Sequence, residues 1–240
     1  MNAIPPFELP HPFSLKDRIA RAGALIFDVD GTLAETEAIH RCAFNAAFRD
    51  FRIAWYWDRR TYKTLLRVAG GKERIRAFAR MQSPPLPLSD QKIAELHRIK
   101  TQHYSRLIAR HACALRPGVE ALMRDALARG QTLALATTTT LGNVEELLSA
   151  SLDRNWRSRF AAVVAGDEVA CKKPAPDVYL EVLARLGYTA GECLAIEDSA
   201  NGLRSASAAG IPVLITRSEY FRDDDFSSAL AVVDDLTHVA

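Results

Sequence analysis

Two carboxylates one residue apart, Asp28 and Asp30, mark the part of this sequence best suited to chemistry. They stand at the end of an apolar run, residues 24–28, that is typical of a short buried strand, and Gly31 and Thr32 follow them where the chain turns. On an extended chain, residues i and i+2 share a face, so both carboxylates reach one small volume. Packing two anions there is costly unless a cation joins them. A divalent metal or a lysine would meet that need.

Polar side chains also follow three later apolar runs that we expect to be strands. These side chains are Thr137, Thr138, Thr139 and Thr140 after residues 132–136, Lys172 and Lys173 after residues 160–165, and Glu197 and Asp198 after residues 193–196. The carboxyl ends of parallel strands lie at the same edge of a sheet, so one site would collect carboxylates, hydroxyls and a lysine. Carboxylate ligands favour Mg²⁺, whereas hydroxyls, helix N-termini and lysine favour phosphate. The combination predicts Mg²⁺-assisted phosphoryl transfer.

Each group taken alone has an ordinary structural explanation. The threonines are good helix N-caps, Glu197 and Asp198 precede another helix, and two neighbouring lysines suit a solvated loop. Four such groups at four successive strand ends are much less expected by chance, and we therefore favour the functional interpretation.

The remaining pattern supplies a scaffold for these strand ends. We expect further strands at residues 212–215 and 231–233, helices at residues 119–129, 144–151, 177–186 and 202–209, and a short helix at residues 14–21. Strands that alternate with helices predict an α/β fold with a Rossmann-like parallel sheet covered on both faces. Residues 37–111 show helical spacing and no strand pattern. We therefore expect an N-terminal extension at residues 1–23, an α/β core at residues 24–36 and 112–240, and an all-helical insert at residues 37–111.

Composition excludes several other classes of protein. The 240 residues are 48% hydrophobic and carry a net charge of +2, which gives no reason to expect a nucleic-acid or membrane partner. No apolar stretch has the length of a membrane span, and residues 1–12 lack the pattern of a secretory signal. The four cysteines lie far apart, so we expect mostly buried thiols in a cytoplasmic protein, which we also expect to be a monomer.

The four polar groups resemble, in type and order, the motifs of the haloacid dehalogenase-like superfamily: Asp-x-Asp-x-Thr, a Ser or Thr, a Lys, and paired acids. The match covers residues 24–216. Residues 173–177 (Lys-Pro-Ala-Pro-Asp) and 197–202 (Glu-Asp-Ser-Ala-Asn-Gly) are similar to its beta-phosphoglucomutase and phosphoglycolate phosphatase branch, and the helical insert resembles the small cap domain of that branch. Residues 32–37, 70–74 and 136–140 resemble the CbbY-like members of that branch.

This resemblance implies a role for each core residue. Asp28 would be the nucleophile that forms an aspartyl-phosphate, and Asp30 the general acid and then the base, protonated in a closed and poorly solvated site. Thr137, with Thr138 or Thr139, would bind the transferring phosphoryl group, and Lys173 would offset its charge. The Mg²⁺ ligands would be Asp28, the backbone carbonyl of Asp30, Asp198 and Glu197. An acid at position 30 favours a phosphatase or mutase over a dehalogenase, because an alkoxide leaving group needs a proton.

The cap would select the substrate. Glu37 and His40 share a helix face, and Lys72, Glu73 and Arg74 follow a glycine pair whose backbone a ligand can approach. Two cations in that segment suit a second phosphate. The expected substrate-binding set is Glu37, His40, Lys72, Glu73, Arg74, Thr138, Thr139 and Asn143. We expect Trp55, Tyr56 and Trp57 to pack inside the cap, and His97 and His103 to be surface or packing residues.

The resemblance therefore implies a Mg²⁺-dependent phosphatase acting on a small phosphorylated sugar, above all a sugar bisphosphate such as xylulose-1,5-bisphosphate. A phosphosugar mutase like beta-phosphoglucomutase is the alternative, because it differs only in whether water or a sugar hydroxyl reaches the aspartyl-phosphate. A non-catalytic binding protein with the same fold is a third hypothesis, but it would have no need to keep Asp28, Asp30, Lys173 and Asp198 together.

Overall fold

The computed structural model describes residues 14–84, 86–111 and 113–239, and it is built around a six-stranded sheet in which every pairing is parallel. The strands lie in the order β3-β2-β1-β4-β5-β6. Their bounds are β1 Ala24–Phe27, β2 Thr132–Ala136, β3 Ala162–Val164, β4 Cys193–Glu197, β5 Val213–Thr216 and β6 Ala231–Val233. This confirms the predicted α/β fold class.

The register of the central strands brings their carboxyl ends together. Ala24 of β1 pairs with Thr132 of β2 on one side and with Cys193 of β4 on the other. The residues that follow these three strands therefore meet at one edge of the sheet, as the sequence predicted.

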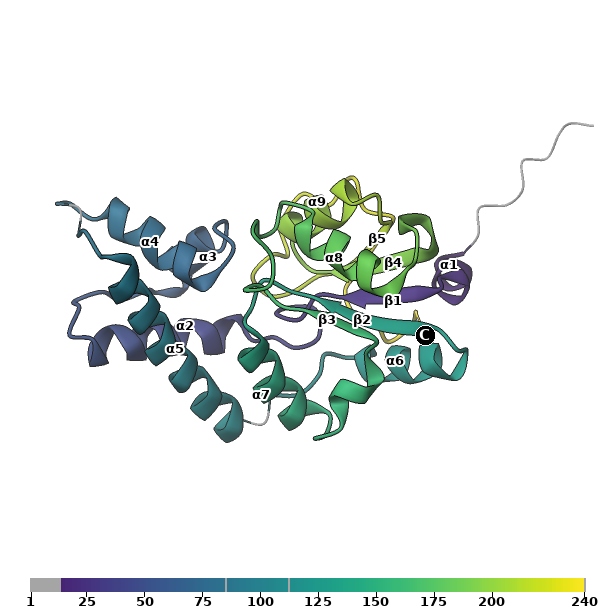
Figure 1. Cartoon of the computed structure of the whole chain (residues 1–240), viewed down its shortest axis with the longest axis horizontal. Coiled ribbons are helices and arrows are strands. Elements are labelled where there is room, and N and C mark those ends of the chain that lie inside the picture. The colour runs from purple at the N-terminus through teal and green to yellow at the C-terminus, as the bar shows by residue number, and fades with distance from the viewer. Residues whose placement is uncertain (1–13, 85, 112, 240) are drawn as a thin grey trace, which may run out of the picture.

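Helices cover both faces of the sheet (Figure 1). The helices α6 (Val119–Ala128) and α7 (Leu141–Ser151) lie on one side, and α8 (Asp177–Leu186) and α9 (Ala200–Ala208) lie on the other. Side chains alternate along each strand, so Leu25 and Phe27 of β1 join the first layer while Ala24 and Ile26 join the second. Burial on both faces explains why the strands are uninterrupted apolar runs.

The insert forms a separate helical cap beside the sheet (Figure 1). It contains α2 (Glu37–Asp50), α3 (Arg59–Leu65), α4 (Gly71–Met81) and α5 (Asp90–His111), and the described part of residues 37–111 holds no strand. Its own core is aromatic: Phe44, Phe48, Trp57 and Tyr62 are all buried. We call this segment the cap and the sheet with its helices the core domain.

Several element boundaries differ from the sequence-based expectation. Helix α7 begins at Leu141 rather than at residue 144, and α9 begins at Ala200 rather than at residue 202. Ser199 is the N-cap residue of α9, and its side chain accepts from the Gly202 N–H. The third strand is Ala162–Val164, shorter at both ends than the predicted 160–165, and a short 3-10 helix, Trp156–Arg159, precedes it. The described part of the N-terminal extension forms α1 (Leu15–Arg21), whose Ile19 is buried in the core domain.

Two packing expectations are wrong. Only Cys193 is buried among the four free cysteines, since Cys42 and Cys171 are exposed and Cys113 is half-buried. Tyr56 is also 70% exposed, because it lies on the outer side of the cap while its neighbour Trp57 fills the interior. Within the described residues, no helix is long and apolar enough to cross a membrane.

Candidate active site

Three carboxylates meet at the carboxyl edge of the sheet. Oxygen atoms of Asp28, Glu197 and Asp198 all lie within 4.8 Å of one another, and all three side chains are buried. Burial, which outweighs the attraction of Lys173, raises the pKa of Asp28 to about 7. Burial and the neighbouring anions also raise the pKa of Asp198 well above its ordinary value. Such a cluster holds its charge only when cations join it.

Lys173 is one of those cations. Its ammonium donates to Asp28 Oδ1 (2.7 Å), Glu197 Oε1 (2.5 Å) and the carbonyl oxygen of Ala136 (2.8 Å). Only 5% of the residue is exposed, and the two carboxylates raise the pKa of its ammonium although burial works in the opposite direction. Lys173 therefore ties the loop after β3 to the ends of β1, β2 and β4.

A free carboxylate oxygen of the cluster suits a metal ion. Asp198 Oδ2 is buried and makes no hydrogen bond within the described residues, whereas both Glu197 oxygens accept hydrogen bonds. A Cβ at Gly31 would lie 1.9 Å from Asp198 Oδ2, so a glycine with φ +86° keeps this approach open. Oxygen ligands with a net negative charge fit Mg²⁺. Asp28 and Asp198 are thus the side chains placed to hold it, with Glu197 beside them.

Asp30 faces the cap and not the acidic cluster. Its Oδ1 accepts from the Thr36 hydroxyl (2.5 Å) and lies 2.9 Å from His40 Nε2. Lys100 Nζ lies 2.6 Å from His40 Nδ1. Because the ammonium donates to Nδ1, the imidazole proton is placed on Nε2, and Nε2–H donates to Asp30. Burial alone would raise the pKa of Asp30, but His40 and Thr36 outweigh it and hold this pKa below its ordinary value. In this conformation these contacts favour the ionised form of Asp30, and its protonation in a closed site stays a prediction.

The threonine run lines the same cavity. Thr137 is 1% exposed, and its Oγ1 accepts from the Thr139 N–H (3.2 Å). Asn143, in the first turn of α7, donates to Thr139 Oγ1 (2.9 Å). Thr140 is the N-cap residue of α7, but its hydroxyl makes no capping bond. Helix capping therefore does not account for Thr140, and all four threonines of the run line the cavity.

The cap closes the cavity from the other side. Every predicted site residue except Glu197 lines it. Glu37 Oε2 accepts from the Tyr62 hydroxyl (2.6 Å), and Arg74 donates to Tyr62 Oη (3.1 Å) and to the carbonyl oxygen of Leu65 (3.2 Å). Arg74 is thus largely engaged inside the cap, and Glu73 folds back against Gly70. Lys72 keeps 40% of its side chain exposed and pairs with Asp167 at 3.4 Å at the cavity mouth.

Several residues of this site were not assigned a role from the sequence. Lys100 is 2% exposed and supports His40, and Tyr179 donates to Glu197 Oε1 (2.6 Å). Lys172, grouped with Lys173 at the third predicted strand end, lines the cavity mouth, and His97, expected to be a surface or packing residue, is buried and lines the cavity as well. Lys100 and His97 lie three residues apart on one helix, which is a usable signal for a shared face. The Tyr179 contact has no comparable sequence signal.

Comparison with known proteins agrees with this geometry. The model of the haloacid dehalogenase-like hydrolase family matches residues 22–210. Protein CbbY of Rhodobacter capsulatus is 52% identical over 218 residues, which cover 90% of this chain and 95% of that protein. The plasmid CbbY of Cupriavidus necator is 51% identical over 213 residues, covering 88% and 84%.

Solved structures give the same result. CbbY from Rhodobacter sphaeroides, in complex with phosphate, has a TM-score of 0.87 and 44% identity, covering 91% of this chain and 96% of that one. A mutant of that protein in complex with xylulose-1,5-bisphosphate has a TM-score of 0.86 at 44% identity, covering 90% and 96%. With this sequence identity, the family-model match and the assembled motifs in agreement, the chain belongs to the haloacid dehalogenase-like hydrolases and is a phosphatase of that family.

Proposed function

We propose that this protein is a Mg²⁺-dependent phosphatase that acts on a small sugar bisphosphate, such as xylulose-1,5-bisphosphate, through an aspartyl-phosphate. The observation that carries the proposal is the meeting of Asp28, Lys173 and Asp198 in one buried cluster, with Asp30 and the cap across the same cavity. Similarity to a CbbY that was crystallised with xylulose-1,5-bisphosphate supports the substrate class.

In this proposal Asp28 attacks phosphorus. Its Oδ1 is occupied by the Lys173 ammonium, which leaves the other oxygen for attack. A Mg²⁺ ion held by Asp28, Asp198 and the Asp30 carbonyl would neutralise charge on the cluster and on the phosphoryl oxygens. Thr137 and Thr139 line the side of the cavity where the phosphoryl group would lie. Positioning and charge stabilisation supply most of the acceleration in such a transfer.

Asp30 moves the protons. Ionised and held by His40 and Thr36, it is ready to act as the base that activates water against the aspartyl-phosphate. To protonate the leaving sugar oxygen it must first take up a proton. Release from His40 would remove the main contact that lowers its pKa, so a change at this contact accompanies the acid step.

In this proposal the second phosphate of the substrate binds at the cavity mouth. Lys72 of the cap lies 3.4 Å from Asp167, and Lys172 of the core domain lies 3.9 Å from the same carboxylate. One anion therefore stands between two cations from different domains. A substrate phosphate carries more charge than Asp167 and would bind both lysines, which favours a bisphosphate over a monophosphate.

A phosphate-release screen over sugar monophosphates and bisphosphates, with and without Mg²⁺, tests the proposal. We expect release from a bisphosphate only with Mg²⁺, and its loss in Asp28→Asn and Asp30→Asn. Appreciable turnover by Asp28→Asn would exclude the covalent route. An isomerised monophosphate with no net phosphate release would indicate the mutase alternative.

Variants of the cap test the substrate class. Lys72→Ala should raise KM for the bisphosphate by about tenfold, the value of one charge-assisted contact, and leave a small aryl phosphate unaffected. Arg76→Ala is the matched control, because Arg76 lies on the same helix but pairs with Asp90 on its outer side. An equal effect of both variants would count against the assignment. A monomeric state and a cytoplasmic location stay predictions.

A further inference from the structure

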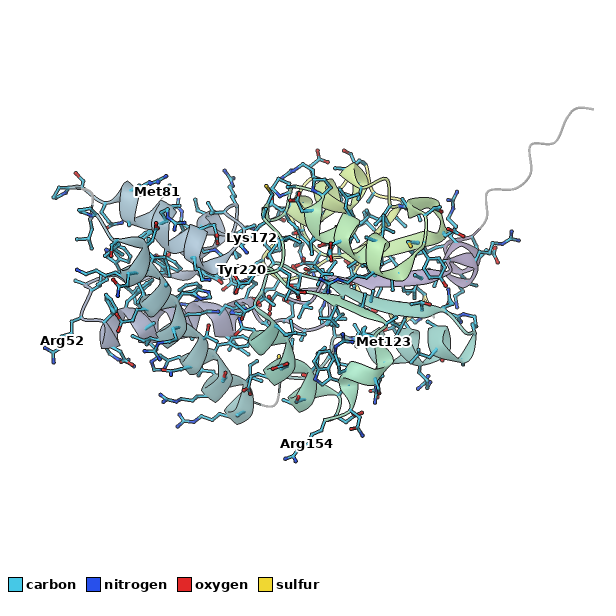
Figure 2. The ribbon with its side chains drawn as sticks, in the orientation of Figure 1. Arg52, Met81, Met123, Arg154, Lys172 and Tyr220 are labelled. Atoms are coloured by element: carbon cyan, nitrogen blue, oxygen red, sulfur yellow. The ribbon has the colours of Figure 1, made fainter. Side chains whose placement is uncertain are left out.

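A loop of the core domain is inserted into the cap. Tyr220 follows β5 in the chain, yet it is 3% exposed and belongs to the aromatic cluster of the cap and not to the layers that cover the sheet. Figure 2 shows Tyr220 at the junction of the two domains. Its neighbour Phe221 packs against the same cluster and also lines the active-site cavity. This loop, residues 218–225, is therefore a contact between the domains at the edge of the site.

The aromatic ring is the main element of this contact. The rings of Tyr220 and Tyr62 meet edge to face with their centroids 5.8 Å apart, and the Arg59 guanidinium lies 5.2 Å from the centre of the Tyr220 ring. Two ion pairs flank it: Arg59 with Glu219 (2.5 Å) and Lys63 with Asp223 (3.1 Å). These pairs are solvent-exposed and contribute little. A buried edge-to-face ring pair contributes more.

Tyr62 connects this contact to the substrate cavity. Its hydroxyl donates to Glu37 Oε2 (2.6 Å) and accepts from Arg74 (3.1 Å). Glu37 is 8% exposed and lines the cavity. A shift of the Tyr62 ring would therefore move the hydroxyl that orients the Glu37 carboxylate.

The other end of the loop lies beside the acidic cluster. Ser218 is 2% exposed, and a Cβ at Gly31 would approach both its Cβ (3.3 Å) and Asp198 Oδ2 (1.9 Å). The next residue donates its backbone N–H to Glu35 Oε1 (3.1 Å), on the linker to the cap. The loop thus spans the short distance from the metal-site acid to the cap interior.

We propose that Tyr220 is a positioning residue: its ring docks the cap onto the core domain through Tyr62 and thereby orients Glu37 toward the sugar. This inference rests on the proposed phosphatase function and adds a specificity determinant to it. The position of the cap, and with it the orientation of Glu37, would then depend on an aromatic contact with the core domain that neither the substrate nor the metal touches.

Substitution of Tyr220 separates positioning from a general structural role. Tyr220→Ala should lower kcat/KM for the sugar bisphosphate by about tenfold, the upper value of an aromatic pair, mainly through KM. A small aryl phosphate, which does not reach Glu37, should change less than about twofold. Tyr220→Phe keeps the ring and should retain most of the activity. Arg60→Ala is the control, because Arg60 is an exposed neighbour of Arg59 on the same helix.

A double-mutant cycle tests the route through Glu37. Tyr220→Ala added to Glu37→Gln should cost less than about twofold further, because both changes remove one coupled interaction. Equal losses on both substrates, no loss on the bisphosphate, or fully additive effects with Glu37→Gln would each overturn the proposal.

Small-angle scattering gives a readout that does not depend on activity. The radius of gyration should increase in Tyr220→Ala and remain unchanged in Tyr220→Phe and Arg60→Ala. A wild-type radius in the alanine variant would overturn the docking role. A wild-type enzyme inactive on every sugar phosphate would instead refute the proposed function, and the scattering comparison would still decide whether Tyr220 docks the cap.

Discussion

Addition of Mg²⁺ should stabilise this protein strongly at about pH 8 and hardly at all at about pH 5. In the metal-free folded protein, Asp28 keeps its proton up to about pH 7, whereas the unfolded chain releases it near the ordinary value of 3.8. The folded state thus binds more protons in this window, and metal-free stability falls as pH rises through it. Mg²⁺ replaces the proton, so the gain from the metal grows as pH rises.

The magnitude follows from the competition between proton and metal. If one proton must leave Asp28, the apparent Mg²⁺ affinity falls about tenfold for each pH unit below 7, or about 2.7 kcal/mol from pH 7 to pH 5. Release of a second proton from Asp198, whose pKa is also raised, would make the dependence steeper. A Mg²⁺ concentration about a hundred times Kd at about pH 8 adds about 2.7 kcal/mol, or about 5–10 °C in Tm for a chain of this size.

Thermal melts with and without Mg²⁺ at the two pH values measure this shift. The difference in Tm between melts with and without Mg²⁺ reports the acidic cluster alone. Other titrating groups, such as the buried His97 with its pKa lowered to about 3, affect the metal-free and the Mg²⁺-bound protein alike. Asp198→Asn should abolish the shift, while Asp167→Asn, at the exposed cavity mouth, should keep it. An equal shift at both pH values, or none at about pH 8, would refute the idea that a cation completes this cluster.

Three further substitutions test the core domain. Lys173→Met should abolish turnover. It should also lower the free energy of unfolding of the metal-free protein by about 3–5 kcal/mol, because it leaves buried carboxylates unpaired. Urea denaturation at about pH 8 measures this loss. Gly202→Ala would place a Cβ 1.9 Å from a buried carboxylate oxygen and should destabilise the fold by about 2 kcal/mol or more. Gly142→Ala, with nothing within 4 Å of the new Cβ, should instead stabilise it by about 0.4–1 kcal/mol; a similar loss in both glycine variants would contradict the steric argument.

The sheet was predictable because its strands are buried on both faces. A parallel strand such as β2 or β4 is a short apolar run followed directly by polar residues. The sequence therefore indicates both the strand and the polar residues that follow it. Helix starts were harder to predict. The α7 and α9 helices begin at Leu141 and Ala200, directly after the N-cap residues Thr140 and Ser199 and ahead of the apolar periodicity from which they were predicted.

Contacts between distant parts of the chain had no such local signal. Lys100 reaches His40 across 60 positions within the cap, and Tyr220 of the core domain reaches Tyr62 of the cap. The first contact depends on how two cap helices pack together and the second on how the cap is rotated against the sheet, and hydrophobic periodicity determines neither. The sequence likewise suggested Arg74 as a phosphate ligand by its charge alone, whereas bonds to Leu65 and Tyr62 hold much of its guanidinium inside the cap.

Glu197 and Asp198 show why neighbouring acids of one motif need a structure to be told apart. Glu197 is fully buried, and its Oε1 accepts from both Lys173 and Tyr179, while its Oε2 accepts the Asp198 N–H. Direct metal ligation by Glu197 would compete with these donors. Asp198 has no such contacts at Oδ2, and burial without a partner costs free energy that a cation would recover. We therefore infer that Glu197 holds the lysine beside Asp28, and that Asp198 would be the acid available to hold a metal ion.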